Sequence, residues 1–111
     1  MNSKQNLNVK FLTIFQEATE KYDIIFTAEE RVYDQVVEHF NEAGNTSSEL
    51  VHVVNIDIQD NHEEATIGAF LICELVETLT RCHDVDDEIS EILLDMENKC
   101  NRPILHCVLF Y

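Results

Sequence analysis

Cysteines and histidines in the last third of the chain are the residues best suited to chemistry. They occur as Cys82-His83, Cys100 and His106-Cys107, and thiolates and imidazoles are good zinc ligands. Structural zinc sites usually contain a tight Cys-x-x-Cys or His-x-x-x-His pair, which this spacing lacks. Cys82 and Cys100 also fall on the apolar faces of predicted helices, where a free cysteine behaves as a small hydrophobe. We therefore expect buried thiols, no metal site and no cofactor; a metal-binding domain built from Cys82, Cys100 and His106 is kept as an alternative.

Motifs for covalent or phosphate chemistry are missing from the sequence. The only glycines are Gly44 and Gly68, so there is no Gly-rich phosphate loop, Gly-x-Ser-x-Gly elbow or Walker lysine. Adjacent residues of a strand point to opposite faces, so His106 cannot directly activate Cys107. Carboxylate pairs carry little information in a chain with 22 acids. The sequence predicts a protein that is not an enzyme and has no catalytic residue.

The segment from Asp84 to Glu97 is the best candidate for a binding surface, because it holds seven acids and no basic residue. A polar rim around an exposed apolar residue is typical of contact surfaces. The predicted partner-binding residues are Asp84, Asp86, Asp87, Glu88, Glu91, Leu94 and Asp95. The alternative is an ordinary solvated helix face whose first acids suit the helix dipole. The helix dipole does not explain Glu91 and Asp95, which lie beyond the first turn. Both interpretations stay open.

The charge balance narrows the choice of partner. The chain has 22 Asp and Glu residues and seven Lys and Arg residues, which gives a formal net charge of −15. Nucleic acids and anionic membranes are disfavoured, since both require clusters of basic residues. Basic proteins are favoured because opposite electrostatic fields speed their encounter. The alternative is that the acidity only keeps the protein soluble.

Length and termini indicate one cytoplasmic domain. The 111 residues fit a single globular domain, 1–111. The first ten residues, MNSKQNLNVK, lack the apolar run of a signal peptide, and no stretch is long enough to span a membrane. The four cysteines are therefore expected to be free thiols.

Hydrophobic periodicity predicts the elements that would position these residues. Residues 4–21 have a helical apolar stripe, 24–26 form either a short strand or a connection, and about 28–43 form a helix. Residues 49–59 alternate as a strand, about 63–82 and 86–100 are helices, and Pro103 precedes a last strand. Ile67 and Phe70 lie outside the main apolar arc of their helix. We expect them to be buried; the alternative is contact with something outside this chain.

The resulting fold class is α/β, or α+β. It consists of a small two- or three-stranded, at least partly parallel sheet packed by about four helices, in the order α-(β)-α-β-α-α-β. A two-stranded sheet with both faces apolar would be hard to bury in one monomer. Either the third strand exists or the sheet continues across a dimer.

Together these features predict a small acidic inhibitor that binds a protein. An immunity protein, an antitoxin or a DNA mimic would place carboxylates in a basic cleft of a nuclease toxin or nucleic-acid-binding protein. A second hypothesis is a homodimeric structural or regulatory subunit without catalytic activity, assembled through the last strand or the Ile67–Phe70 stripe.

Overall fold

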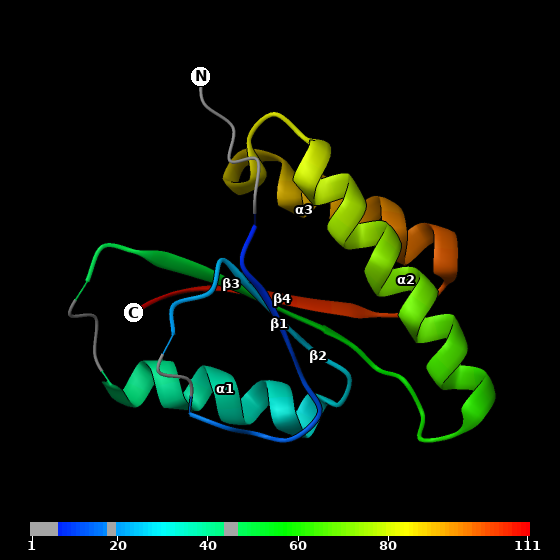
Figure 1. The fold of residues 1–111 in the computed structure, drawn as a ribbon, viewed down its shortest axis with the longest axis horizontal. Helices are drawn as coiled ribbons and strands as arrows, with labels where there is room; N and C mark the ends of the chain where they lie inside the picture. Colours follow the sequence, from blue (N-terminus) through cyan, green and yellow to red (C-terminus); the bar gives the residue numbers. More distant parts are fainter. Residues whose placement is uncertain (1–6, 18–19, 44–46) are drawn as a thin grey trace.

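A computed structural model describes residues 7–17, 20–43 and 47–111. A four-stranded sheet has the order β1-β2-β3-β4, with β1, β2 and β3 parallel and β4 antiparallel to β3 (Figure 1). The elements in chain order are β1 (Val9–Leu12), β2 (Ile24–Thr27), α1 (Glu30–Ala43), β3 (Leu50–Ile56), α2 (His62–Arg81), α3 (Val85–Cys100) and β4 (Ile104–Phe110).

The predicted fold is wrong in the number and order of its elements. The described residues form four strands and three helices in the order ββαβααβ, where two or three strands and about four helices were expected. The error lies in residues 4–21: the predicted helix is replaced by β1 and an irregular segment, while 4–6 and 18–19 lie outside the described residues. Residues 24–26, left open between strand and connection, belong to β2 and complete the parallel part of the sheet.

The helices cover both faces of the sheet and form three layers. Helices α2 and α3 lie on one face and α1 lies on the other (Figure 1). Alternate residues of a strand therefore enter different cores: Ile24, Phe26 and Val54 pack toward α2 and α3, whereas Ile25 and Val53 pack toward α1. This explains why β2 and most of β3 are apolar on both faces, as expected of strands covered on both sides.

Side-chain caps set the ends of the two helices on one face. Asn61 accepts a hydrogen bond from the backbone N–H of Glu64 at the start of α2, and Asp84 accepts one from Asp87 at the start of α3. Asn101 ends α3 in the left-handed conformation, at φ 59°, which asparagine tolerates better than most residues. The turn directs the chain back into β4.

The expectation that Ile67 and Phe70 are buried is wrong. Their exposed fractions are 44% and 73%, respectively, so α2 exposes two large apolar side chains to solvent. Among the described residues, no helix combines the length and apolar character needed to cross a membrane.

Candidate functional site

The three parallel strands bring their carboxyl ends to one edge of the sheet. In open α/β sheets, ligands bind in the crevice outside the carboxyl ends of the strands. Here β2 ends at Thr27, and β3 is followed directly by the loop Asp57–Asp60. We call this region the carboxyl edge; two cavities open there, and residues 28–29 and 58–60 line both of them.

A chain of hydrogen bonds joins the strand ends beneath this loop. Thr27 and Asn55 are opposite each other in the β2–β3 register, and both are buried. The Thr27 hydroxyl donates to Asn55 Oδ1 at 2.8 Å, and Asn55 Nδ2 donates to Asp57 Oδ1 at 2.9 Å. Buried polar groups require partners, so the two amide interactions fix the Asp57 carboxylate at the mouth of the site.

A bidentate ion pair fastens the same loop from the other side. Arg102, just before β4, places Nη1 and Nη2 each 2.7 Å from the two carboxylate oxygens of Glu64. Arg102 Nη1 also donates to the Asp57 carbonyl, and Glu64 accepts the backbone N–H of Gln59. The Arg102 contact lowers the pKa of Glu64 to about 2, and the backbone hydrogen bond from Gln59 acts in the same direction. Helix α2, the loop and the start of β4 thus form one anchored unit.

The cavities at the carboxyl edge differ in character. One is a groove of about 510 Å³ between β1 and α2, with mostly apolar walls that include Phe11, Ile72 and Cys73. The other, of about 560 Å³, is bordered by the first turn of α1 and includes Arg31. Asp60 lines both cavities and therefore lies where the apolar groove meets the cavity beside α1. This arrangement suits an extended ligand with a polar reacting group.

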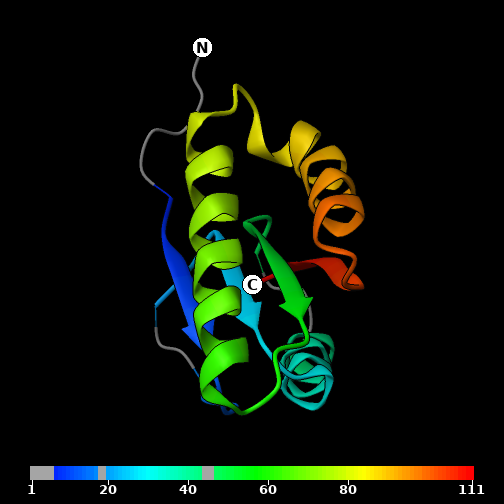
Figure 2. The same cartoon turned by 90° about the vertical axis from the view of Figure 1, so that its right-hand side faces the viewer.

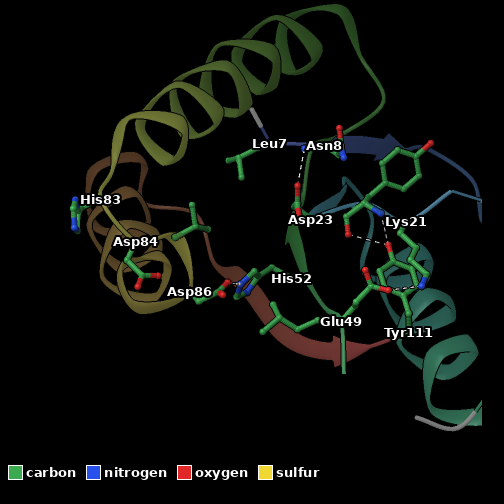
Figure 3. Close-up of a pocket in the computed structure, with 13 residues that line it drawn as sticks. Leu7, Asn8, Lys21, Asp23, Glu49, His52, His83, Asp84, Asp86 and Tyr111 are labelled. Atoms are coloured by element: carbon green, nitrogen blue, oxygen red, sulfur yellow. Dashed lines mark hydrogen bonds and ion pairs between the residues drawn. The ribbon is translucent and has the colours of Figure 1, made fainter. Parts of the chain in front are cut away.

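A larger cavity, of about 760 Å³, lies at the amino ends of the strands (Figure 3). Its polar groups mainly bond with one another: Lys21 pairs with Glu49, the Asn8 backbone N–H donates to Asp23, and Tyr111 donates to the Tyr22 carbonyl. These contacts tie the ends of the sheet together. We therefore place the candidate site at the carboxyl edge despite the larger volume here.

Beside this second cavity, His52 links α3 to the sheet. Its Nε2 lies 2.7 Å from Asp86 Oδ1, and its Nδ1 lies 3.1 Å from His106 Nε2. The two imidazoles stack with ring centroids 5.3 Å apart. Burial lowers the pKa of His106, and the neighbouring His52 lowers it further. In Figure 3 the Asp86 carboxylate points toward His52.

The structure gives several of the predicted partner-binding residues a role within the chain. Asp84 caps α3, Glu88 accepts the Asp84 backbone N–H at 2.8 Å, and Asp86 contacts His52. All of the predicted surface residues are exposed except Glu88, which is half-buried. Their contact with a partner stays a prediction.

The cysteines and histidines considered as metal ligands do not gather. Among the described residues, no group of three or more His, Cys, Asp or Glu is arranged to hold a metal ion. Cys100 packs against the core under α2 and α3, and Cys107 against the core under α1. Burial raises the pKa of the Cys82 thiol and the nearby Glu88 raises it further, which disfavours the reactive thiolate.

Sequence reasoning missed the carboxyl edge, although one signal was available. Asn55 and Asp57 follow three apolar β-branched residues, Val51, Val53 and Val54, where a buried strand leaves the core. Polar residues directly after a buried strand mark the end of a sheet where α/β proteins bind ligands. The signal was hidden because β1 was not predicted and residues 24–26 were left open between a strand and a connection.

Comparisons with known proteins give one consistent answer. The mouse RNA polymerase II C-terminal domain phosphatase SSU72 is 55% identical over 97 residues, and the human protein is 54% identical. A crystal structure of D. melanogaster Ssu72 with symplekin, bound to a cis peptidomimetic phosphoserine peptide of the C-terminal domain, superposes with a TM-score of 0.81 at 42% identity. Each match covers 87% of this chain, together with 50% of the mammalian relatives and 51% of the fly chain. The chain thus spans about half the length of these relatives.

These matches overturn the functional predictions made from composition. The inhibitor, immunity-protein, antitoxin and DNA-mimic interpretation is wrong, and the dimeric-subunit and metal-domain alternatives do not fit either. The prediction of a non-enzyme is wrong because the relatives are named phosphatases. The expected basic toxin or nucleic-acid-binding partner is also wrong, since the fly structure contains symplekin and a phosphopeptide mimic. The model of Ssu72-like proteins matches residues 3–111, and the chain belongs to this family.

Proposed function

We propose that this chain takes part in removing phosphate from serine residues of the C-terminal domain of RNA polymerase II. The observation that carries the proposal is the identity above 50% to relatives with this named activity. The geometry of the carboxyl edge supports it: the apolar groove between β1 and α2 suits an extended peptide, and carboxylates stand at its mouth. Phosphoserine is the substrate group, by analogy with the peptide mimic on the fly protein.

Asp60 is the residue that we assign as general acid. In the hydrolysis of a phosphoserine, oxygen from water ends on phosphorus, the bond from phosphorus to the serine oxygen breaks, and that oxygen takes up a proton. A carboxylic acid placed beside the leaving oxygen can supply this proton. Asp60 lines both cavities of the carboxyl edge, whereas Asp57 is engaged by Asn55. Glu29 also lines both cavities, but its carboxylate lies 3.4 Å from the Arg31 guanidinium. Asp57 therefore shapes the site, and we assign proton donation to Asp60.

Phosphate release from a synthetic phosphoserine peptide of the C-terminal domain tests this assignment. Asp60→Asn should lower the rate about 10²- to 10⁴-fold, the usual contribution of a general acid. Asp57→Asn should have a smaller effect, because an amide can keep the contact with Asn55. Asp95→Asn is the matched control, since this exposed carboxylate lies on α3 outside both cavities.

Two results would contradict the proposal. If the wild-type chain releases no phosphate above background, it does not carry out this reaction alone. If the wild-type chain is active but Asp60→Asn retains its rate within twofold, the carboxyl edge is not the source of the proton.

A further inference from the structure

We propose that Arg102 and Glu64 are positioning residues: their ion pair holds the loop 57–60 in the arrangement that presents Asp60 to the substrate. The inference deepens the proposed function and rests on it for its kinetic consequences. Its structural part, a loop whose order depends on Arg102, can be measured without phosphate release.

Asp60 depends on its neighbours for its position. The residue is exposed and has no hydrogen-bond or ion-pair partner among the described residues. The residues beside it in the chain are held. The Gln59 N–H donates to Glu64 Oε1 at 3.2 Å, and the Asn61 N–H donates to the Gln59 carbonyl at 2.9 Å. Figure 2 shows the chain turning here from the end of β3 into the start of α2.

The ion pair of Arg102 and Glu64 differs from an ordinary surface pair. Both terminal nitrogens of the guanidinium contact the carboxylate, each at 2.7 Å, and such bidentate contacts fix orientation as well as distance. The two side chains are only 22% and 21% exposed, whereas those of Arg81 and Glu77 are 72% and 67% exposed. Exposed pairs contribute little because solvent and salt screen them. The Arg102 pair is therefore suited to holding a loop in place.

The pair acts on the loop through two main-chain groups. Arg102 Nη1 donates to the Asp57 carbonyl at 3.2 Å, at the first residue of the loop. Glu64 accepts the N–H of Gln59, directly before Asp60. Loss of the guanidinium would release the Asp57 carbonyl and free the Glu64 carboxylate to rotate. One side chain at the start of β4 thus controls both contacts.

Neither member of the pair is placed to contact the substrate. Arg102 and Glu64 line neither of the cavities at the carboxyl edge. A general acid must lie within hydrogen-bond distance of the oxygen that it protonates, and a displacement of about 1 Å can lower a rate about 10²-fold. Disturbing the pair should therefore reduce kcat through the position of Asp60 and leave KM nearly unchanged.

Steady-state phosphate release from the synthetic phosphoserine peptide tests the kinetic consequence. Arg102→Gln should lower kcat about 10- to 10²-fold and change KM by less than about twofold. Arg102→Lys keeps the charge but not the planar fork, so it should recover only part of the rate. Arg81→Gln is the matched control, because it removes an arginine from the exposed pair with Glu77. Its rate should stay within about twofold of the wild type.

Combination with Asp60→Asn separates positioning from a general structural role. In that background there is no acidic proton to position, so Arg102→Gln should lower kcat by less than about twofold further. A full tenfold loss in the Asp60→Asn background would overturn the inference, because Arg102 would then act independently of Asp60. A rise in KM at constant kcat would also overturn it, since Arg102 would then bind the substrate.

Amide hydrogen exchange measures the order of the loop whether or not the chain is active. In Arg102→Gln the amides of Ile58 and Gln59 should exchange at least about tenfold faster, while those of Val53 and Val54 in β3 stay within about twofold. Unchanged exchange in the loop overturns the inference, and so does equally faster exchange in β3, which would indicate global destabilisation. The expected loop exchange in a chain that releases no phosphate would contradict only the proposed function.

Discussion

Substitution Thr27→Val tests whether the hydrogen-bond chain at the strand ends stabilises the fold. Valine keeps the β-branched shape but removes the hydroxyl that donates to Asn55 Oδ1 at 2.8 Å. Thr27 and Asn55 are 0% and 1% exposed, so water cannot replace the lost donor without rearrangement. A buried acceptor left without a donor costs about 1–3 kcal/mol. With about 4 °C per kcal/mol for a domain of this size, Tm should fall by roughly 8 °C for a 2 kcal/mol loss.

Urea unfolding at pH 7 provides the assay, with the midpoint converted to a free energy of unfolding. Thr66→Val is the control, because this exposed hydroxyl donates only within α2, to the His62 carbonyl; its effect should stay within about 0.5 kcal/mol. The double variant Thr27→Val, Asn55→Leu should lose less free energy of unfolding than the two single variants together, because each single change already removes the same Thr27–Asn55 hydrogen bond. If Thr27→Val alone changes the free energy of unfolding by less than about 0.5 kcal/mol, the reasoning about the buried pair is refuted.

Three further predictions concern acid stability and packing. Glu64 has a pKa of about 2 in the folded protein, below its usual value near 4.3. The contribution of Glu64 to the free energy of unfolding should be complete above about pH 4.3 and lost as pH falls toward 2. Arg102→Gln should remove this pH dependence from urea midpoints measured between pH 5 and 3. The pKa of His106 is also lowered on folding, so stability should decrease as pH falls below about 6.5; His106→Phe should flatten that part of the profile. A Cβ added at Gly68 would lie 2.2 Å from Ile58 Cδ1. The cost of overpacking, about 1–3 kcal/mol, exceeds the gain in helix propensity from alanine, about 1 kcal/mol. Gly68→Ala should therefore destabilise the fold by about 1 kcal/mol. Calorimetry should show that adding Ile58→Val, which removes Cδ1, recovers part of the lost Tm.

Long elements with one strong period could be predicted from the sequence. The segments assigned to helices at about 28–43, 63–82 and 86–100 coincide with α1, α2 and α3 within a few residues. Their apolar stripes reflect a single buried face, which a sequence pattern records directly. The strand at 49–59 coincides with β3, because β-branched residues and alternation act together there.

The first strand could not be predicted because its sequence satisfies a helical period as well. Leu7, Phe11 and Ile14 have helical spacing, and a four-residue strand is too short for its alternation to compete. What selects the strand is pairing: Val9 aligns with Ile24 in a parallel ladder, and local sequence does not record such a contact. Missing β1 removed the parallel neighbourhood that defines the carboxyl edge, so Asp57 and Asp60 were not considered as site residues.

The acidic composition was misleading for a related reason. Net charge describes the whole surface, whereas function depends on where individual carboxylates stand. Asp86 binds a buried imidazole, Glu64 anchors a loop through Arg102, and Asp84 caps a helix. Each of these acids has a structural partner that a count of charges cannot reveal.

The pairing of β3 with β4 has a consequence for the rate of folding. Leu50 aligns with Phe110 and Ile56 with Ile104, so this ladder closes only after both intervening helices have been accommodated. Contacts between distant parts of a chain slow folding, because the entropy of closing the loop is lost before the contact contributes. During that interval β3, which has the longest run of buried residues, has one flank unpaired. The last step of folding is therefore expected to be the arrival of β4, and substitutions in β4 should accelerate unfolding more than they slow folding.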